Sequence, residues 1–361
     1  MKKGASMKQL SPLERVTVSK KGIKPDKISI STGPTNEFIC HRYGISIEDY
    51  LTNAEWCTEC SVKFVREFEV DSSVVAPGYI LYGCGPEVGV KWEFVENHFP
   101  GFVDGPLKTE SDLQAIRVPN KPSGHFKHYL EVLSKVQDAI GDRYNLIGHI
   151  LGPFATACFL HGIEATLLDT VAEPEWFKKY MERSTDLSEY FGKNVLSTGV
   201  RNPILNEIFL TPEMIGPESY HRLIAPYDIE VQRRLGADSV PNVMGAFMGR
   251  AGDRESQEGG VFLYRAFFGV NESLATITRA MEHLLPGFPF PVTLSGQTLD
   301  IWEIDRILDF FKEAMDFLIK EKGIYPSIHL ASVLADSPEE AKRIAEKLEA
   351  IKQFRDGYEI P

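Results

Sequence analysis

Short apolar runs alternate with longer amphipathic stretches along most of this chain. The clearest example begins at Asn145, where the run NLIGHIL is followed by a Gly-Pro break and then by a helical pattern that continues to Met181. A continuous apolar run of this length is typical of a strand buried on both faces, and the break places a turn at its carboxyl end. The pattern predicts a β-strand, an abrupt turn and an amphipathic helix in succession.

Further strand-like runs and helical patterns lie on both sides of this unit, at a spacing of roughly 30 to 40 residues. Helix boundaries are marked by a cap at Ser46, a stop at Gly141, a break at Pro226 and caps at Asn271 and Ser337. The other strands are expected at residues 27–32, at the start of the run 72–94, which then continues as irregular or hairpin structure, and at 201–210, 239–249, 261–269, 290–296 and 325–334.

Repeated units of strand and helix predict an α/β protein, a single (β/α)8 TIM-type barrel. The 361 residues would also suffice for two domains, but single barrels of this length are common. We expect residues 1–27 to form a polar N-terminal arm and residues 28–361 to form the barrel. A loop-rich stretch at 95–125 is expected to form a cap over the barrel mouth.

Composition limits the classes of function. A formal charge of −12 without clustered Lys and Arg argues against nucleic-acid binding, because neutralising phosphates requires basic patches. The sequence has no run of about 18 apolar residues and no signal-peptide pattern, so we expect a cytoplasmic enzyme without membrane association. The five cysteines are expected to be thiols, because their number is odd and no secretory context accompanies them.

The reactive groups of barrel enzymes lie at the carboxyl ends of the strands, and this rule selects the candidate residues. His149 and Glu207 are the candidate catalytic residues. The candidate substrate-binding residues are Asn206, Asn242, Met244, Tyr264, Arg265, Ser295, Gln297 and His329.

These candidates also have structural interpretations. If the His149 side chain points into the barrel, it would be a ligand or a base. The alternative is a buried His149 that is held in the protein core by hydrogen bonds. Glu207 is costly to bury alone, so it is either a functional carboxylate or the partner of Arg265 in an ion pair. Arg265 suits a carboxylate or a flat ring of the substrate if it is free of that pair. Ser295 and Gln297 offer neutral hydrogen bonds, although loops also use such residues to hold their own backbone.

Three segments carry a resemblance to a known group of enzymes. They are GPFATACFLHGIEATLLDTVAEPEWFKKYM, with its Gly-Pro-Phe turn; ESYHRLIAPYDIEVQRRLGA, with its Pro-Tyr pair; and SVLADSPEEAKRI near the C-terminus. In this order they resemble motifs of the uroporphyrinogen decarboxylase and cobalamin-dependent methyltransferase superfamily, across residues 40 to 355. The resemblance implies a (β/α)8 barrel.

The sequence departs from two branches of that superfamily. The coenzyme M methyltransferases hold zinc with a histidine-x-cysteine-glycine turn and a later cysteine, but the corresponding positions here are AFMG at 246–249 and Ala331. Uroporphyrinogen decarboxylases carry an arginine-rich N-terminal signature and a C-terminal histidine, and neither has a counterpart in this chain. We therefore expect a diverged member that lacks the thiolate zinc site.

From the resemblance we expect a corrinoid-dependent methyltransferase that takes methyl from an O-methyl or N-methyl compound. It would bind no cofactor tightly, because cobalamin would be carried by a separate corrinoid protein. One alternative is a cofactor-free decarboxylase, or other lyase, of an aromatic or tetrapyrrole-like acid whose carboxylate contacts Arg265 or Arg250. Another is a catalytically silent barrel that binds a ligand or a partner protein. The resemblance and the polar arm also imply a homodimer.

The presence of zinc stays open. Cys57 and Cys60 have the spacing of a zinc-ligand pair, but no second pair completes four ligands. If zinc is bound, we expect Glu207 and His149 as ligands and His329 as a weaker third, because no two cysteines fall at strand ends. The alternative is a pocket without metal.

Overall fold

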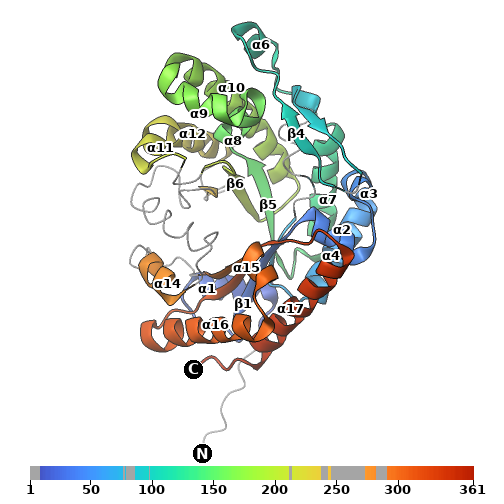
Figure 1. The fold of residues 1–361 in the computed structure, drawn as a ribbon, viewed down its shortest axis with the longest axis vertical. Helices are drawn as coiled ribbons and strands as arrows, with labels where there is room; N and C mark the ends of the chain where they lie inside the picture. Colours follow the sequence, from blue (N-terminus) through green and yellow to red (C-terminus); the bar gives the residue numbers. More distant parts are fainter. Residues whose placement is uncertain are drawn as a thin grey trace, which may run out of the picture.

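The computed structural model describes residues 9–75, 78, 86–96, 98–210, 214–236, 243–244, 273–281 and 291–361. Seven strands form its main sheet: β1 (Ser29–Pro34), β2 (Ser72–Val74), β5 (Asn145–Leu151), β6 (Asn202–Asn206), β7 (Val243–Met244), β8 (Pro291–Ser295) and β9 (Ser327–Val333). Neighbouring strands are all parallel and follow the order β7-β6-β5-β2-β1-β9-β8. Figure 1 shows them in the middle of the molecule, with helices around them.

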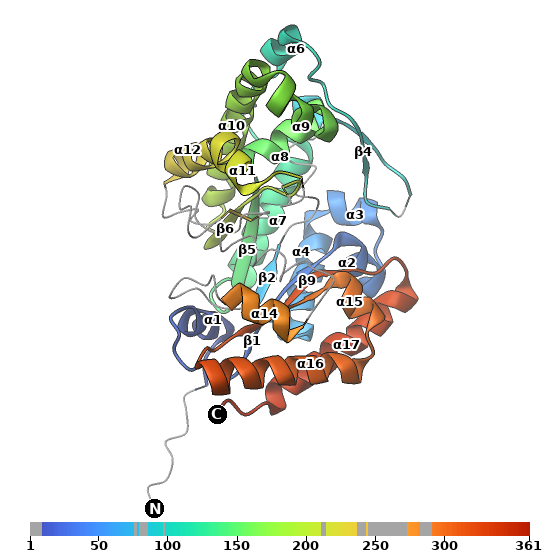
Figure 2. The same cartoon turned by 60° about the vertical axis from the view of Figure 1, so that its left-hand side comes forward.

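Helices connect the strands along the outside, which confirms the predicted α/β barrel class (Figures 1 and 2). None of the described helices is both long and apolar enough to cross a membrane. The helices are α1 (Pro12–Lys20), α2 (Asn36–Tyr43), α3 (Ile47–Thr52), α4 (Ala54–Glu67), α6 (Glu110–Ala115), α7 (Gly124–Ile140), α8 (Pro153–His161), α9 (Ile163–Ala172), α10 (Pro174–Ser197), α11 (Pro217–Leu223), α12 (Ala225–Leu235), α14 (Leu274–Met281), α15 (Gly296–Ile301), α16 (Ile304–Asp316) and α17 (Pro338–Gly357), with short η1 (Pro86–Val88) and η2 (Phe317–Glu321) turns.

The structure divides two of the predicted helices. The stretch after the Gly-Pro break forms α8, α9 and α10, and Gly162, at φ 103°, separates the first two. Side chains disfavour this backbone angle, so a glycine permits the change of direction. The helix that begins after Ser46 ends early, and Asn53 caps a new one. The predicted caps at Ser46 and Ser337 and the break at Pro226 are confirmed.

The strand register distinguishes the two faces of the sheet. Residues paired across parallel strands point to the same face, and successive residues point to opposite faces. A Cβ added at Gly148 on β5 would lie 3.2 Å from Leu133 of α7 and 3.4 Å from Val195 of α10. The face that includes Gly148 therefore packs on the helices, and its neighbour His149 points to the inner face.

The inner face, which we call the lumen face, is rich in polar residues. The register joins Thr293, His329, Ser31, Ser72 and Asn145 across five strands. The Asn145 side chain donates a hydrogen bond to the Ser72 hydroxyl at 2.8 Å, in agreement with this assignment. The opposite face supplies the apolar core, with residues such as Leu146, Ile150, Leu205, Val292, Leu294, Ile328 and Leu330.

The N-terminal arm contributes a helix to the barrel. Helix α1 contacts β1, β2 and β5. Its Arg15 is buried and forms ion pairs with Asp26, at 2.7 Å, and with Asp71 at the start of β2. Asp71 also accepts the N–H of Ile30 at 2.8 Å and lies 3.6 Å from Arg355. The amino ends of the strands are thus held by buried ion pairs, which indicates a structural role for this end of the barrel.

The cap predicted at 95–125 contains the strand β4 (Gly101–Asp104) and α6, and β4 forms an antiparallel hairpin with β3 (Lys91–Glu93), which precedes the predicted range. The Trp92 and Phe102 rings lie 5.5 and 5.7 Å from the ring of Phe159 on α8. A Cβ at Gly105 would lie 2.1 Å from the Leu160 carbonyl oxygen, so the chain approaches α8 where only glycine fits. The hairpin is therefore anchored to the helix that follows β5 (Figure 2).

Candidate functional site in the barrel lumen

The backbone of His149 is held by a side chain where a neighbouring strand ends. Strand β2 pairs with β5 as far as Val74 and Ile147. Beyond that point the buried Tyr129 hydroxyl of α7 accepts the N–H of His149 at 2.9 Å and donates to its carbonyl oxygen at 3.1 Å. These two bonds occupy backbone groups that a strand would otherwise satisfy. Tyr129 therefore fixes the position from which the imidazole enters the lumen.

The His149 imidazole is uncharged and carries its proton on Nε2. The Asn206 amide nitrogen lies 3.3 Å from Nδ1, and an amide NH2 group can only donate. Nδ1 is consequently the acceptor, which leaves the proton on Nε2. Burial lowers the pKa of His149 to about 4, so the ring is neutral at pH 7. In this arrangement the side chain offers an N–H donor rather than a base.

Strands β8 and β9 contribute a second group of uncharged side chains. Burial lowers the pKa of His329 to about 4. The Thr293 hydroxyl is buried and has no hydrogen-bond partner among the described residues. The Ser295 hydroxyl accepts the N–H of Thr298 at 3.1 Å and caps α15. Ser295 thus holds the backbone at the start of α15, which is the structural interpretation of this residue given in the sequence analysis.

Glu207 lies directly after Asn206 but is directed to helix α8. Its two carboxyl oxygens accept the N–H groups of Phe154 at 3.0 Å and Ala155 at 2.6 Å. These are orphan donors of the first helical turn, where a carboxyl group is favourable. A Cβ at Gly152 would lie 2.3 Å from the Glu207 carboxyl carbon, so glycine is required for this approach.

The carboxyl group of Glu207 is fully buried together with that of Asp228 on α12. Burial and the neighbouring Asp228 raise the pKa of Glu207 well above its ordinary value. Burial also raises the pKa of Asp228, which accepts the Tyr220 hydroxyl at 2.8 Å. The arrangement joins β6, α8 and α12, and it gives Glu207 a structural partner other than the Arg265 considered above.

The structure brings His149 and Asn206 together and places His329 on the same face of the sheet. Gln297 is exposed on the first turn of α15. The remaining candidates lie outside the described residues: Asn242, Tyr264, Arg265 and the side chain of Met244. The catalytic and binding roles assigned to all of these residues stay predictions.

Two residues of the site were missed by the sequence analysis. Thr293 precedes Ser295 by two positions in FPVTLSG, so strand alternation places both on one face and could have indicated it. Tyr129 lies in a helical pattern where an aromatic residue normally signals core packing. Its bonds to His149 depend on the point at which β2 ends, and no local pattern gives that point.

The zinc ligands predicted from the sequence do not come together in the described part of the chain. No three His, Cys, Asp or Glu side chains there could hold a metal ion. Glu207 is bound to the start of α8, whereas His149 and His329 are on the lumen face. Cys57 and Cys60 are buried in α4, and no further ligand joins them among the described residues to complete a metal site. The described residues therefore do not fit zinc.

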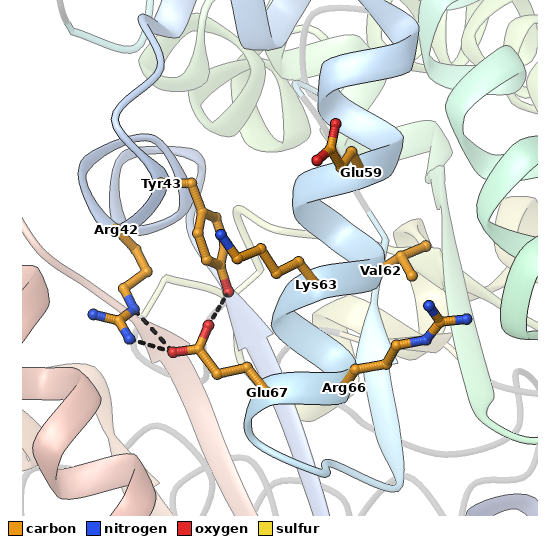
Figure 3. A pocket seen from close by; sticks show the side chains of 7 residues that line it. All are labelled: Arg42, Tyr43, Glu59, Val62, Lys63, Arg66 and Glu67. Atoms are coloured by element: carbon orange, nitrogen blue, oxygen red, sulfur yellow. Dashed lines mark hydrogen bonds and ion pairs between the residues drawn. The ribbon is translucent and has the colours of Figure 1, made fainter.

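A charged pocket on the outer surface lies between α2 and α4 (Figure 3). Glu67 pairs with Arg42 and accepts the Tyr43 hydroxyl at 2.8 Å, while the Lys63 ammonium lies 4.6 Å from the centre of the Tyr43 ring. Arg42, Tyr43 and Glu67 stand at the carboxyl ends of their helices, beside the amino ends of the strands. Catalytic groups of barrels lie at the other end, so we assign no chemistry to this pocket.

The fold and the lumen define the class of protein: a (β/α)8 barrel with polar side chains on the inner face of its strands. Residues 21–250 match the profile described as Uroporphyrinogen decarboxylase (URO-D). The chain belongs to the uroporphyrinogen decarboxylase family.

Curated relatives include both a decarboxylase and a methyltransferase. Uroporphyrinogen decarboxylase of Aliarcobacter butzleri (strain RM4018) is 21% identical over 189 residues, 51% of this chain and 53% of the relative. Methylcobamide:CoM methyltransferase MtbA of Methanosarcina acetivorans is 21% identical over 169 residues, 46% of this chain and 48% of the relative. The chain spans about half the length of the curated relatives it matches.

A solved structure agrees over nearly the whole chain. A methyltransferase from Methanosarcina mazei superposes with a TM-score of 0.74 and 15% identity, covering 96% of this chain and 98% of that one. At this identity the likeness shows the fold alone. It supports the assignment of the seven described strands to a barrel.

Proposed function

We propose that this protein is a corrinoid-dependent methyltransferase that removes methyl from an O-methyl or N-methyl compound. The observation that carries the proposal is the neutral Nε2–H donor of His149 on the lumen face, fixed by Asn206 and Tyr129. Breaking a carbon–oxygen bond leaves the bonding electron pair on oxygen, and a fixed donor stabilises the charge that develops there. The methyltransferase relative and the methyltransferase of similar fold add support.

In this proposal His149 contacts the heteroatom that loses the methyl group. Because the charged ring of His149 has a pKa of about 4, the imidazole is already neutral at pH 7. The neutral ring donates a hydrogen bond from Nε2–H and keeps that proton, and the leaving oxygen takes its proton from water. Asn206 maintains the Nε2–H tautomer, and Tyr129 holds the backbone. Cobalamin, carried by a partner protein, would supply the methyl acceptor. We assign no residue of this chain to holding it, and we derive no step through zinc, which the described residues do not fit.

The proposal is tested by mixing the protein with a reduced corrinoid protein and a panel of aryl methyl ethers, alkyl methyl ethers and methylamines. We expect the absorbance of methylcobalamin to appear with at least one donor. Removing one donor that stabilises developing charge lowers the turnover rate about 100-fold, so His149→Phe should lose that much. His149→Gln, which keeps an N–H donor, should retain part of the activity, and exposed His98→Gln should retain all of it.

Failure of every donor on the panel would contradict methyl transfer. The second candidate is a cofactor-free decarboxylase, or other lyase, of an aromatic or tetrapyrrole-like acid, which the family and the decarboxylase relative favour. Release of carbon dioxide without any corrinoid would establish it in place of the first. Activity of neither kind, with unchanged function in the cell after His149→Phe, would favour a silent ligand-binding barrel.

We further propose that the protein acts in the cytoplasm as a homodimer and that its partners are a small-molecule methyl donor and a corrinoid protein. Light scattering coupled to size-exclusion chromatography measures the oligomeric state. A mass of about 41 kDa, that of a single 40.6 kDa chain, would contradict the dimer.

A further inference from the structure

We propose that His161 and Asp169 form a proton-dependent latch that ties the cap to helices α8 and α9. The imidazole of His161 lies between the cap and Asp169 of α9, and it binds both only while it carries two protons. The cap is therefore released as the pH rises. The latch does not depend on the reaction proposed above.

The His161 ring contacts a hydrogen-bond acceptor at each of its nitrogens. Nδ1 lies 2.8 Å from the carbonyl oxygen of Leu107 in the cap. Nε2 lies 3.0 Å from a carboxyl oxygen of Asp169, and the side chains of His161 and Asp169 are only 12% and 14% exposed. Leu107 is buried, and its N–H donates to the carbonyl oxygen of Leu160 at 2.9 Å. The last residue of α8 thus joins the cap to α9.

A neutral imidazole cannot satisfy both contacts. A carbonyl oxygen can only accept a hydrogen bond, and so can an ionised carboxylate, so each contact needs an N–H on the ring. The neutral ring has one N–H, and its bare nitrogen would face the lone pairs of the other acceptor. An aspartic acid is ordinarily a stronger acid than an imidazolium, so the second proton belongs to Nε2 and the ring is charged. The latch is therefore an ion pair to Asp169 together with a hydrogen bond to the backbone of the cap.

The groups that face the ring favour an ionised Asp169. The Tyr180 hydroxyl of α10 donates to the same Asp169 oxygen at 3.3 Å. Burial and the neighbouring Asp169 raise the pKa of Tyr180, so its hydroxyl remains a donor. Cys158, one turn before His161 on α8, adds no charge, because burial raises the pKa of its thiol. The Tyr180 and Trp176 rings lie 5.3 and 6.4 Å from the imidazole and limit the access of water, so the ion pair is only weakly screened.

The pH dependence follows from the number of protons that each state binds. The latched ring of His161 holds two protons, whereas a released imidazole loses one of them around pH 6.5. Above this pH the latched state binds more protons than the released state, so the latch is favoured at low pH and lost as the pH rises. A hydrogen bond to a charged group changes such an equilibrium about tenfold or more.

Asp169→Asn separates the effect of the proton from that of the packing. The amide NH2 group can donate to a bare Nε2 of His161 and to the Tyr180 oxygen, so a neutral ring with its proton on Nδ1 satisfies both contacts. This variant keeps the latch at high pH and weakens it at low pH, where a charged ring faces the amide hydrogens. Lys179→Gln is the matched control, because Lys179 of α10 forms an exposed ion pair with Glu110 of α6 that also holds the cap but contains no histidine.

The experiment is hydrogen–deuterium exchange of the full chain, read by mass spectrometry of a peptide that contains residues 101–110. This peptide includes the N–H of Leu107 and none of the substituted positions, so its chemical exchange rate at a given pH is the same in all variants. We expect Asp169→Asn to exchange faster than the wild type at pH 5.5 and about tenfold more slowly than the wild type at pH 8.5. Lys179→Gln should follow the wild type at both pH values, because an exposed ion pair contributes little.

A loss of packing cannot imitate a reversal between the two pH values. If Asp169→Asn and the wild type exchange in the same order, or at the same rate, at pH 5.5 and pH 8.5, the inference is wrong. Two-bond ¹H–¹⁵N correlation spectra give a second measurement. The wild type should show both ring nitrogens of His161 protonated at pH 6, and Asp169→Asn should show a bare Nε2 at pH 8.5. A bare ring nitrogen of His161 in the wild type at pH 6 would also overturn the inference.

Discussion

The two candidate catalytic residues come from neighbouring strands but have different surroundings: His149 lies on β5, and Glu207 directly follows β6. His149 is neutral, points into the lumen and is bound to Asn206. Glu207, the next residue after Asn206, is turned away from the lumen and binds two N–H groups at the start of α8. Asn206, which binds His149 in the site, and Glu207, which stabilises the fold, are thus consecutive residues at the end of β6.

The comparison shows that burial and a perturbed pKa do not identify a catalytic residue by themselves. Burial shifts the pKa of both groups towards the neutral form. What differs is direction: the imidazole lies on the inner face of the sheet, whereas both carboxyl oxygens of Glu207 accept N–H groups of α8. Changes near Glu207 should therefore affect stability, and changes near His149 should affect activity.

The largest effect is expected for Gly152→Ala. The added Cβ would lie 2.3 Å from the Glu207 carboxyl carbon, and the helix start and the carboxyl group cannot both stay in place. We expect a loss of about 3 kcal/mol or more in the free energy of unfolding, measured by urea titration. Gly216 also precedes a helix that begins with proline, and a Cβ added there would have no atom within 4 Å, so Gly216→Ala should be nearly neutral. Equal losses in the two variants would contradict the close packing of Glu207.

A second effect concerns pH and His149. Its pKa is about 4 in the folded protein and 6.5 in the unfolded chain, so the unfolded chain binds more protons between these values. Stability is therefore lost as pH falls from 6.5 to 4, by about 3 kcal/mol from this residue. Urea titrations at pH 7 and pH 4.5 should show a smaller loss in His149→Gln than in the wild type. Glu207 and Asp228 have raised pKa values, so they contribute the opposite pH dependence of stability in both proteins. Their contribution cancels when the loss in the variant is subtracted from the loss in the wild type. An equal loss in both would show that His149 is not buried in its neutral form.

A smaller effect is expected for Glu207→Gln. The amide keeps one carbonyl oxygen as an acceptor, but its NH2 group cannot accept the second N–H at the start of α8, so one of the two bonds is lost. We expect a loss of about 1–2 kcal/mol in the free energy of unfolding and an unchanged turnover rate in the methyl-transfer assay. A turnover rate that falls about 100-fold while stability stays unchanged would return Glu207 to the site.

Much of this fold follows from local patterns, because strands buried on both faces and helix caps leave signals in a few adjacent residues. NLIGHIL, the Gly-Pro break and the caps at Ser46 and Ser337 are of this kind. The direction of Glu207 is different, since it depends on β6 ending at Asn206 and on α8 starting beside it. Thr293 lies between these cases: strand alternation places it on the same face as Ser295, and the partners of β8 identify that face as the inner one.

The most direct test of the account is the protonation state of His149. Two-bond ¹H–¹⁵N correlation spectra of the histidine-labelled protein, with the signal assigned from His149→Gln, distinguish the two neutral tautomers and the charged ring. We predict the neutral Nε2–H tautomer at pH 7, persisting on titration down to about pH 5. A proton on Nδ1, or a charged ring at pH 7, would contradict the assignment of His149 as the neutral donor of the lumen.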